Sequence, residues 1–489
     1  MPMRLALSRK NLWERTPSFL KSLVGQAAAR IPAPYLFGVR FRASLAFARE
    51  AQRWPAEKAR DYQLGRVREL CLLAYEKTDF YRRAFHQAGF VPGDLRSLED
   101  FSALPTIDKE TIRTSMNSMC TVSPGSSGVD YVATGGSSGE PLRFLIGSDR
   151  SAVEYAYLLA SWERVGYRLG VPLAVFRGQV VKPWRDGFRH EHDPLLHRHY
   201  YSNFHMSPQD IRRYLEHIAT LGPCYFLVYP SAIDTIARFL EESGTPAPSN
   251  IQGILAGSEN VYDDYRPRVE SVFGARFFSW YGHSEKLVLA AECESSTEYH
   301  VWPTYGYFEL LDPDGHAVTT PGQRGEIVGS GFINRVIPFV RYRTGDYAVL
   351  SGHTCKACGR EQTVLSRIEG RWPQGDLTAR DGSPISMTAF NVHDDTFEAT
   401  RGFQFFQSEP GQAVLRVVPT RPLSREARER IVSRVNARLQ GQVHVTLDVR
   451  SELQLTPTGK QLRVVRAASS SVPGSPVLPD DSNDVPVPR

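Results

Sequence analysis

Four side chains able to bind a metal ion stand in two short segments of the chain. Cys293 and His300 are separated by six residues, and Cys355 and Cys358 form a CxxC pair. Three thiolates and one imidazole make a closed tetrahedral site, which suits structural Zn²⁺ and leaves no open position for a substrate. A redox-active CxxC is less favoured, because this pair does not open a helix in a thioredoxin-like βαβ unit. Two unrelated pairs of reduced cysteines remain the simplest alternative.

A glycine- and serine-rich stretch, TGGSSGEP at 134–141, lies between two apolar runs. Small residues let backbone N–H groups turn inward around an anion, and Thr134, Ser137 and Ser138 add hydroxyl donors. The stretch lacks the GK[ST] of a Walker loop, and an ordinary turn has the same composition. By itself the loop is a weak indication of phosphate binding.

Further motifs each carry a side chain that suits a nucleotide substrate. In YGHSE, Tyr281 can stack on a purine and Glu285 can bind Mg²⁺. In YRTGD, Asp346 can accept hydrogen bonds from two ribose hydroxyls. RIEGR supplies two arginines, and PTGK ends in Lys460. Each has a plain alternative when taken singly: a strand end, a common turn, an exposed basic loop or a solvated lysine.

Composition restricts the classes of partner. The formal net charge is +5 over 489 residues, and Lys and Arg are scattered, which disfavours nucleic acid as the main partner. No apolar stretch approaches the roughly 20 residues that a transmembrane helix needs, and the N-terminus lacks a signal-peptide pattern. The six cysteines are too scattered for a disulfide framework. We therefore expect a cytoplasmic protein with small-molecule partners.

The elements that must position these residues follow an α/β order. Helical spacing in residues 57–75 and 77–89 predicts helices near the start of the chain. From about 130 to 350 strands alternate with helices, which favours a mostly parallel sheet flanked by helices. The turn signals DPDG and PGQRG then indicate shorter antiparallel strands. Near Arg371 a new unit begins, in which a hairpin, an amphipathic helix and a strand predict a small α+β domain.

The predicted fold class is therefore α/β, with a large N-terminal domain of parallel and mixed sheets, a small antiparallel strand unit, and a small mobile α+β C-terminal domain. We predict a helical extension at 1–55, the large domain at 56–371, and the small domain at 372–467. Residues 468–489 are rich in Pro, Ser and Asp without periodicity, which predicts a disordered tail.

Taken together, the motifs resemble those of the adenylate-forming (AMP-dependent acyl-CoA synthetase) superfamily, in the same order, over residues of about 60–466. TGGSSGEP resembles the phosphate loop, with Gly135 where Ser or Thr is usual and Leu142 where Lys is usual. TDFYRRAFHQAGF, LPTIDKETIR and CGR…RIEGR are most similar to the phenylacetate–CoA ligase-like branch and its CapK (capsular polysaccharide biosynthesis) members. Those proteins carry a similar zinc-binding pattern.

The resemblance implies the adenylate-forming fold and a two-step ligase reaction. A small carboxylic acid attacks the α-phosphate of ATP to give acyl-AMP and pyrophosphate, and the acyl group then passes to an acceptor, with CoA ranked first. Lys460 and Glu285 are the implied catalytic residues, and Glu285 would also hold Mg²⁺. Zn²⁺ would be structural and would keep two active-site loops in register. The residues implied to bind the nucleotide are Thr134, Gly135, Gly136, Ser137, Ser138, Gly139, Gly257, Ser258, Glu259, Tyr281, Gly282, Ser284, Asp346, Arg367 and Arg371.

One departure from the family pattern bears on the acceptor. Pro373 stands two residues past Arg371, where a hinge Asp or Lys is usual, and proline fixes φ near roughly −65°. Either the hinge moves to Gly375 and Asp376 or the rotation is restricted, so CoA is ranked only slightly ahead of an amine or hydroxyl acceptor. An acyl-protein synthetase, a non-catalytic binding protein and a homodimer stay open, whereas a zinc hydrolase is disfavoured. His205 and Tyr229 are candidates for the acid pocket.

Overall fold

The computed structural model describes residues 33–123, 125–133, 142–370, 376–387, 396–397, 399–454 and 463–466. Four of the predicted features lie outside these residues: the loop at 134–139, Arg371, Pro373 and Lys460. Most of the predicted N-terminal extension and the predicted tail at 468–489 lie outside them as well. Among the described residues, no helix has the length and apolar character needed to cross a membrane.

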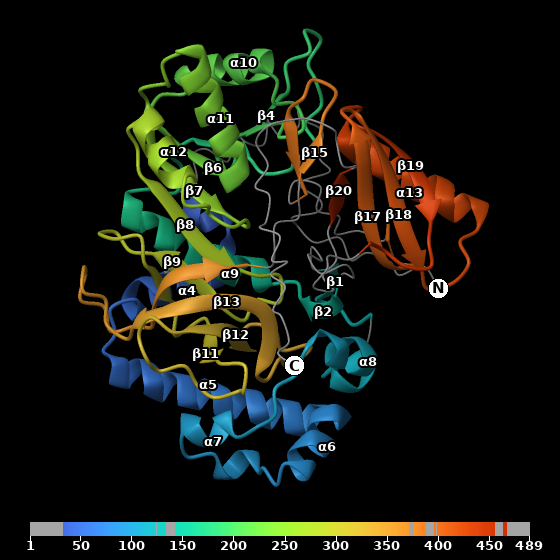
Figure 1. Cartoon of the computed structure of the whole chain (residues 1–489). Coiled ribbons are helices and arrows are strands. Elements are labelled where there is room, and N and C mark those ends of the chain that lie inside the picture. Colours follow the sequence, from blue (N-terminus) through green and yellow to red (C-terminus); the bar gives the residue numbers. More distant parts are fainter. Residues whose placement is uncertain are drawn as a thin grey trace, which may run out of the picture.

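The described part of the chain begins with helices, two of which the sequence predicts at 57–75 and 77–89. The second of them starts where the Thr78 hydroxyl accepts a hydrogen bond from the backbone N–H of Tyr81 at 3.2 Å. The apolar sides of these helices pack under the antiparallel strands of the main sheet (Figure 1). The helices and the 3₁₀ turn are α3 (Ala33–Leu36), α4 (Gly38–Ala51), α5 (Ala56–Lys77), α6 (Asp79–Gln87), η1 (Pro92–Asp94), α7 (Leu98–Ser102) and α8 (Lys109–Met119).

One twelve-stranded sheet forms the centre of the protein, in the order β11-β12-β13-β14-β10-β9-β8-β7-β6-β3-β5-β4. Strands β5, β3, β6, β7 and β8 are parallel neighbours, as the alternating pattern predicts. The antiparallel strands from β9 onward continue the same sheet. The bounds are β3 (Leu173–Phe176), β4 (His190–Asp193), β5 (Arg198–Tyr201), β6 (Cys224–Val228), β7 (Ile251–Gly257), β8 (Phe277–Gly282), β9 (Leu289–Glu292), β10 (Tyr299–Val301), β11 (Gly306–Leu311), β12 (Arg324–Gly331), β13 (Tyr342–Gly352) and β14 (Val364–Glu369).

Helices cover both faces of the parallel strands. All five residues of β6 are buried, because alternate side chains enter two different cores. Phe226 and Val228 face the core that holds α10, α11 and α12, whereas Tyr225 and Leu227 face the core that holds α4 and α9. These helices are α9 (Arg150–Trp162), continued by η2 (Glu163–Val165), α10 (Pro208–Ala219), α11 (Pro230–Ser243) and α12 (Tyr265–Phe273).

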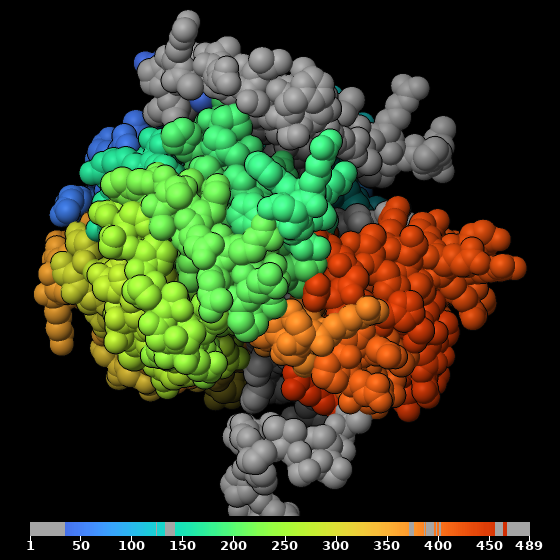
Figure 2. All heavy atoms as spheres, turned by 90° about the horizontal axis from the view of Figure 1, so that it is seen from above, coloured from blue at the N-terminus to red at the C-terminus, as the bar shows by residue number. Residues whose placement is uncertain are grey.

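The C-terminal part has a sheet of its own, in the order β19-β18-β17-β20. In Figure 2 its orange and red residues lie against the green residues of the large part, and residues of α10, α11 and the β15–β16 hairpin line one cavity there. A domain boundary at 371 stays a prediction. The elements are β15 (Asp376–Thr378), β16 (Pro384–Ser386), β17 (Thr400–Glu409), β18 (Gln412–Pro419), α13 (Arg425–Leu439), β19 (His444–Val449) and β20 (Val464–Arg466).

Candidate active site and metal centre

Two parallel strands bring two of the predicted motifs to one edge of the main sheet. Gly257 at the end of β7 pairs with Trp280 of β8, so the segment 257–259 and the YGHSE motif leave the sheet side by side. The carboxyl ends of parallel strands are where α/β sheets commonly bind ligands. A Cβ atom on Gly257 would lie 2.6 Å from the Trp280 ring, so this close approach requires glycine.

A third motif reaches the same place from β13. The Tyr281 hydroxyl donates a hydrogen bond of 2.8 Å to Asp346 Oδ2. Gly345 has a φ of +74°, and its N–H donates to Glu326 at 3.0 Å. The Asp346 N–H donates to the Thr344 hydroxyl at 3.1 Å. Thr344 and Gly345 form no turn but a bulge within β13, where the register with β12 shifts, and this irregularity aims the Asp346 carboxylate at the tyrosine.

Glu285 is buried, with 2% of its surface exposed, and two side chains hold it. The Tyr342 hydroxyl donates to Oε1 at 3.2 Å, and His283 Nδ1 lies 2.9 Å from Oε2. His283 Nε2 accepts a bond of 3.2 Å from the N–H of Val288, so a neutral His283 carries its proton on Nδ1 and donates it to Glu285. His283 is a positioning residue that sequence reasoning missed, since it fills the variable position of the YGHSE motif.

The segment that follows β7 interacts with two neighbouring elements. Ser258 has a φ of +71°, and its hydroxyl accepts a hydrogen bond from Arg177, just after β3. The Glu259 carboxylate accepts the N–H of Ser231 at 2.9 Å, at the start of α11. Arg177 is a second residue that sequence reasoning missed. Its guanidinium lies 5.4 Å from the centre of the Trp280 ring, and its one sequence signal is its place after a buried strand.

The other residues predicted to bind the nucleotide lie in three different places. Gly282 and Ser284 belong to the same YGHSE segment as Tyr281. The Arg367 side chain, on β14, is 64% exposed and pairs with Glu369 at 3.5 Å, and its role in nucleotide binding stays a prediction. The phosphate loop is outside the described residues, but its flanking strands β1 (Val129–Ala133) and β2 (Arg143–Gly147) pair as an antiparallel hairpin. Leu142 is fully buried, which explains an apolar residue there.

Two residues expected at the acid pocket are buried. His205 Nδ1 lies 2.9 Å from the Ser202 hydroxyl, and burial lowers the pKa of His205 to about 4. Its imidazole is therefore neutral near pH 7, the form a general base needs. Burial also raises the pKa of Tyr229, which keeps its hydroxyl protonated. Tyr229 precedes α11, beside Arg177.

The four predicted metal ligands come together. One ligand atom from each of Cys293, His300, Cys355 and Cys358 lies within 4.8 Å of the others. The Sγ atoms of Cys293 and Cys355 are 3.9 Å apart, and Cys358 Sγ is 3.8 Å from His300 Nε2. Arg360 donates to Cys358 Sγ at 3.1 Å, which stabilises a thiolate there.

The expectation that this cluster keeps two active-site loops in register is wrong. Gly282 pairs with Leu289 and Trp280 pairs with Ala291, so β9 runs back toward the start of β8 before Cys293 follows it. The cluster thus lies at the opposite end of these strands from Tyr281. The physical reason is the antiparallel return of β9, which the spacing along the chain does not reveal.

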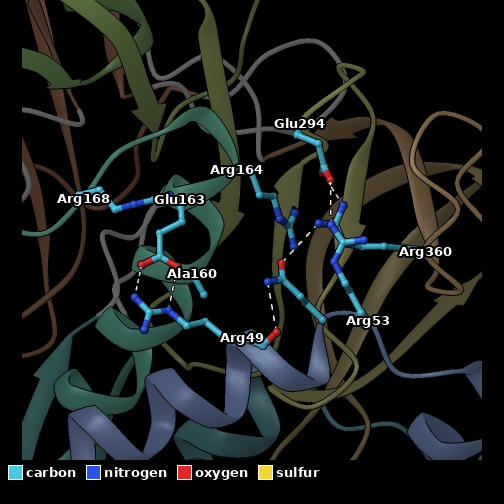
Figure 3. A pocket seen from close by; sticks show the side chains of 9 residues that line it. Arg49, Arg53, Ala160, Glu163, Arg164, Arg168, Glu294 and Arg360 are labelled. Carbon is cyan, nitrogen blue, oxygen red and sulfur yellow. Dashed lines mark hydrogen bonds and ion pairs between the residues drawn. The ribbon is translucent and has the colours of Figure 1, made fainter.

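A basic cavity of about 470 Å³ lies beside this cluster (Figure 3). Some of its guanidinium groups pair with carboxylates: Arg49 pairs with Glu163 and Arg360 pairs with Glu294. None of the predicted nucleotide residues within the described part of the chain lines it. The lining residues are Arg49, Gln52, Arg53, Ala160, Glu163, Arg164, Arg168, Glu294 and Arg360.

Comparisons with known proteins agree on one family. The chain is 26% identical to a phenylacetate-coenzyme A ligase of Thermus thermophilus over 346 residues, which are 66% of this chain and 72% of the relative. It is 27% identical to the enzyme of the same name from Pseudomonas putida, covering 64% of this chain and 70% of the relative. Protein CapK of Staphylococcus aureus is 21% identical, over 64% of this chain and 67% of the relative.

A solved structure has the same fold. The crystal structure of 2-hydroxyisobutyryl-CoA ligase, in complex with 2-HIB-AMP and CoA, matches with a TM-score of 0.55 at 22% identity and covers 85% of this chain and 91% of that one. No family model matches the chain. The motifs, their meeting at one sheet edge and the curated relatives agree: the chain is similar to the phenylacetate–CoA ligases and to CapK, and its motifs resemble those of the adenylate-forming superfamily.

Proposed function

We propose that this protein activates a carboxylic acid with ATP as acyl-AMP, releases pyrophosphate and transfers the acyl group to the thiol of CoA. The observation that carries the proposal is the convergence of Tyr281 and Asp346, joined by a 2.8 Å hydrogen bond, beside the end of β7. The curated relatives named phenylacetate-coenzyme A ligase support an acid–thiol ligase.

A carboxylate is a poor acyl donor, because its oxide is a bad leaving group. When a carboxylate oxygen attacks the α-phosphorus of ATP, a new O–P bond forms and the bond from that phosphorus to pyrophosphate breaks. The acyl carbon then carries AMP as a good leaving group. The protein's part is to position the reactants and to balance charge. Asp346 would accept hydrogen bonds from the ribose hydroxyls, and Tyr281 would lie against the base. The loop at 134–139 would bind the outer phosphates, while Lys460 would meet the charge that develops at the α-phosphate.

Two metal ions belong to this proposal. Glu285 offers the hard carboxylate oxygens that Mg²⁺ prefers. The Mg²⁺ ion, when bound, supplies neutralisation of phosphate charge. At the Cys/His cluster, two sulfurs that each lie about 2.3 Å from Zn²⁺ would be about 3.8 Å apart in a tetrahedral site. The observed 3.9 Å between Cys293 and Cys355 fits that value. Zn²⁺ would join the ends of β9 and β10 to the β13–β14 loop.

An amine or hydroxyl acceptor is the second candidate, because of the residue at position 373. The proline at position 373 favours an amine or hydroxyl acceptor, because a stiff pivot restricts the rotation that presents acyl-AMP to CoA. The sequence leaves an acyl-protein synthetase and a non-catalytic binding protein as further alternatives. Homodimer formation and a cytoplasmic location stay predictions.

The test is acid-dependent pyrophosphate release, screened across carboxylic acids with and without CoA. We expect release from at least one acid, and a thioester product when CoA is added. Asp346→Asn should reduce the release, whereas the matched variant Asp314→Asn, in an exposed turn, should not. If CoA does not change the pyrophosphate release, and an added amine or hydroxyl compound yields an amide or ester, then that compound and not CoA is the acceptor. Release equal in the wild type and Asp346→Asn would reject the site.

A further inference from the structure

A histidine-rich stretch lies far from the motifs described above. The segment FRHEHDPLLHRHYY, residues 188–201, folds into the antiparallel strands β4 and β5 at the edge of the main sheet. His192 pairs directly with His199, and His190 pairs with Tyr201. Because side chains alternate between the two faces of a strand, all four lie on one face of the sheet. His217, in the last turn of α10, reaches the same face, where its Nδ1 lies 2.7 Å from the Tyr201 hydroxyl.

Three of these imidazoles are arranged as metal ligands are. One ring nitrogen from each of His190, His199 and His217 lies within 4.8 Å of the others. His190 Nε2 and His199 Nδ1 are 3.0 Å apart, close to the roughly 3.4 Å between two nitrogens bound to one tetrahedral Zn²⁺. We propose that His190, His199 and His217 form a second metal site, which binds one divalent ion of the zinc, cobalt or nickel type. This proposal does not depend on the ligase reaction.

The surroundings of the cluster suit a metal ligand. His190 is 6% exposed and presents its Nε2 to His199, so this nitrogen is shielded from bulk water. The bond between Tyr201 and His217 fixes the orientation of that imidazole, which is what the outer hydrogen bond of a ligating histidine does.

The ligand type indicates which metals suit the site. A neutral imidazole is the form that binds a metal. Imidazole nitrogen suits Zn²⁺, Co²⁺ and Ni²⁺, while Mg²⁺ and Ca²⁺ prefer oxygen.

A metal ion here would connect elements that otherwise meet through ring contacts. It would bind β4 and β5 to α10 and stiffen the turn from Ser202 to His205, which directly follows β5. Three protein ligands leave a fourth position for water, because His199 and His217 are only half-buried. We therefore expect this ion to exchange more readily than the ion of the closed Cys/His cluster.

The experiment uses the full chain without a polyhistidine tag and Co²⁺ as the probe. Equilibrium dialysis with metal analysis counts the bound ions. The absorption spectrum separates the two sites, since only thiolate ligands give a sulfur-to-metal charge-transfer band. We expect the wild type to bind one Co²⁺ ion that contributes no sulfur-to-metal charge-transfer band. His199→Gln and His217→Gln should each lose this ion or bind it at least about 10-fold more weakly, and Tyr201→Phe should weaken it about 10-fold.

The matched controls are His86→Gln and His444→Gln, which replace exposed histidines outside the cluster and should bind as the wild type does. A Cys355→Ser variant should lose the charge-transfer band and keep the histidine-bound ion. The far-UV circular dichroism of each variant checks its folding. If His199→Gln does not fold, the wild-type count and His217→Gln decide the question. The proposal is overturned if every Co²⁺ ion that the wild type binds gives the charge-transfer band. It is also overturned if a folded His217→Gln variant binds Co²⁺ with unchanged affinity.

Discussion

Tyr281 and Asp346 lie 65 residues apart in the chain and meet in a hydrogen bond of 2.8 Å. The tyrosine comes from the end of β8 and the aspartate from β13, and β14, β10 and β9 separate these two strands in the sheet. The bond therefore links the parallel and the antiparallel parts of one sheet. It holds the carboxylate that we assign to ribose recognition against the ring that we assign to the base.

Removing this pair should weaken ATP binding more than it slows chemistry. Asp346→Ala loses charge-assisted hydrogen bonds worth about 1.5–3 kcal/mol, so we expect KM for ATP to rise about 10- to 100-fold. Tyr281→Phe keeps the ring and should raise KM by about 10-fold at most. ATP/pyrophosphate exchange measures both, with Tyr75→Phe as the control for a half-buried tyrosine elsewhere. If Asp346→Ala changes kcat alone and leaves KM for ATP as it was, the ribose assignment is wrong.

Lys460 should act on the rate of adenylation. Losing one preorganised group that meets developing charge typically costs about 10²–10³ in rate. We expect Lys460→Ala to lose acid-dependent pyrophosphate release by that factor while its thermal unfolding stays that of the wild type. Lys356→Ala, which removes an exposed lysine near the Cys/His cluster, is the control. Undiminished pyrophosphate release by Lys460→Ala would refute the assignment.

Loss of the ion from the Cys/His cluster should lower the unfolding temperature of the protein and leave kcat unchanged. Cys355→Ser replaces a buried ligand, and we expect it to lose Zn²⁺ and to unfold at a temperature several degrees lower. The folded fraction should keep its kcat, because the cluster lies at the far end of the strands from Tyr281. Metal analysis and thermal unfolding measure the effect, and Cys120→Ser, at a half-buried thiol outside the cluster, is the control. An unchanged zinc content in Cys355→Ser would contradict the assignment.

Asp376 should make stability depend on pH. Burial, and then the charge of Glu259, raise the pKa of Asp376 to about 6, against the pull of Arg466. In the unfolded chain the pKa is about 3.9. The folded state therefore favours the protonated form, and stability falls as pH rises from about 4 through about 6.

The comparison with Asp376→Asn isolates this effect. Relative to the wild type, Asp376→Asn should gain stability between about pH 5 and about pH 7.5, on the order of 1.4 kcal/mol. Urea unfolding at the two pH values measures it, with the exposed Asp94→Asn as the control. A stability difference that stays the same at both pH values would show that Asp376 ionises normally in the folded protein.

The sequence by itself was sufficient for the local chemistry. The thiolates and imidazole at Cys293, His300, Cys355 and Cys358 indicated one cluster, and the structure brings them together. The alternation of strands and helices predicted the parallel strands. These inferences succeed because ligand type, turn chemistry and the period of buried side chains depend on residues that are near one another in the chain.

Tertiary structure alone decided where these groups lie relative to each other. Strand direction places the Cys/His cluster away from Tyr281, the turn of the YGHSE motif sets His283 against Glu285, and Arg367 points to solvent. The three histidines at 190, 199 and 217 meet through a strand register and a helix that crosses it. Pairing partners and register arise from packing between distant segments, and no spacing along the chain encodes which ends of two strands will meet.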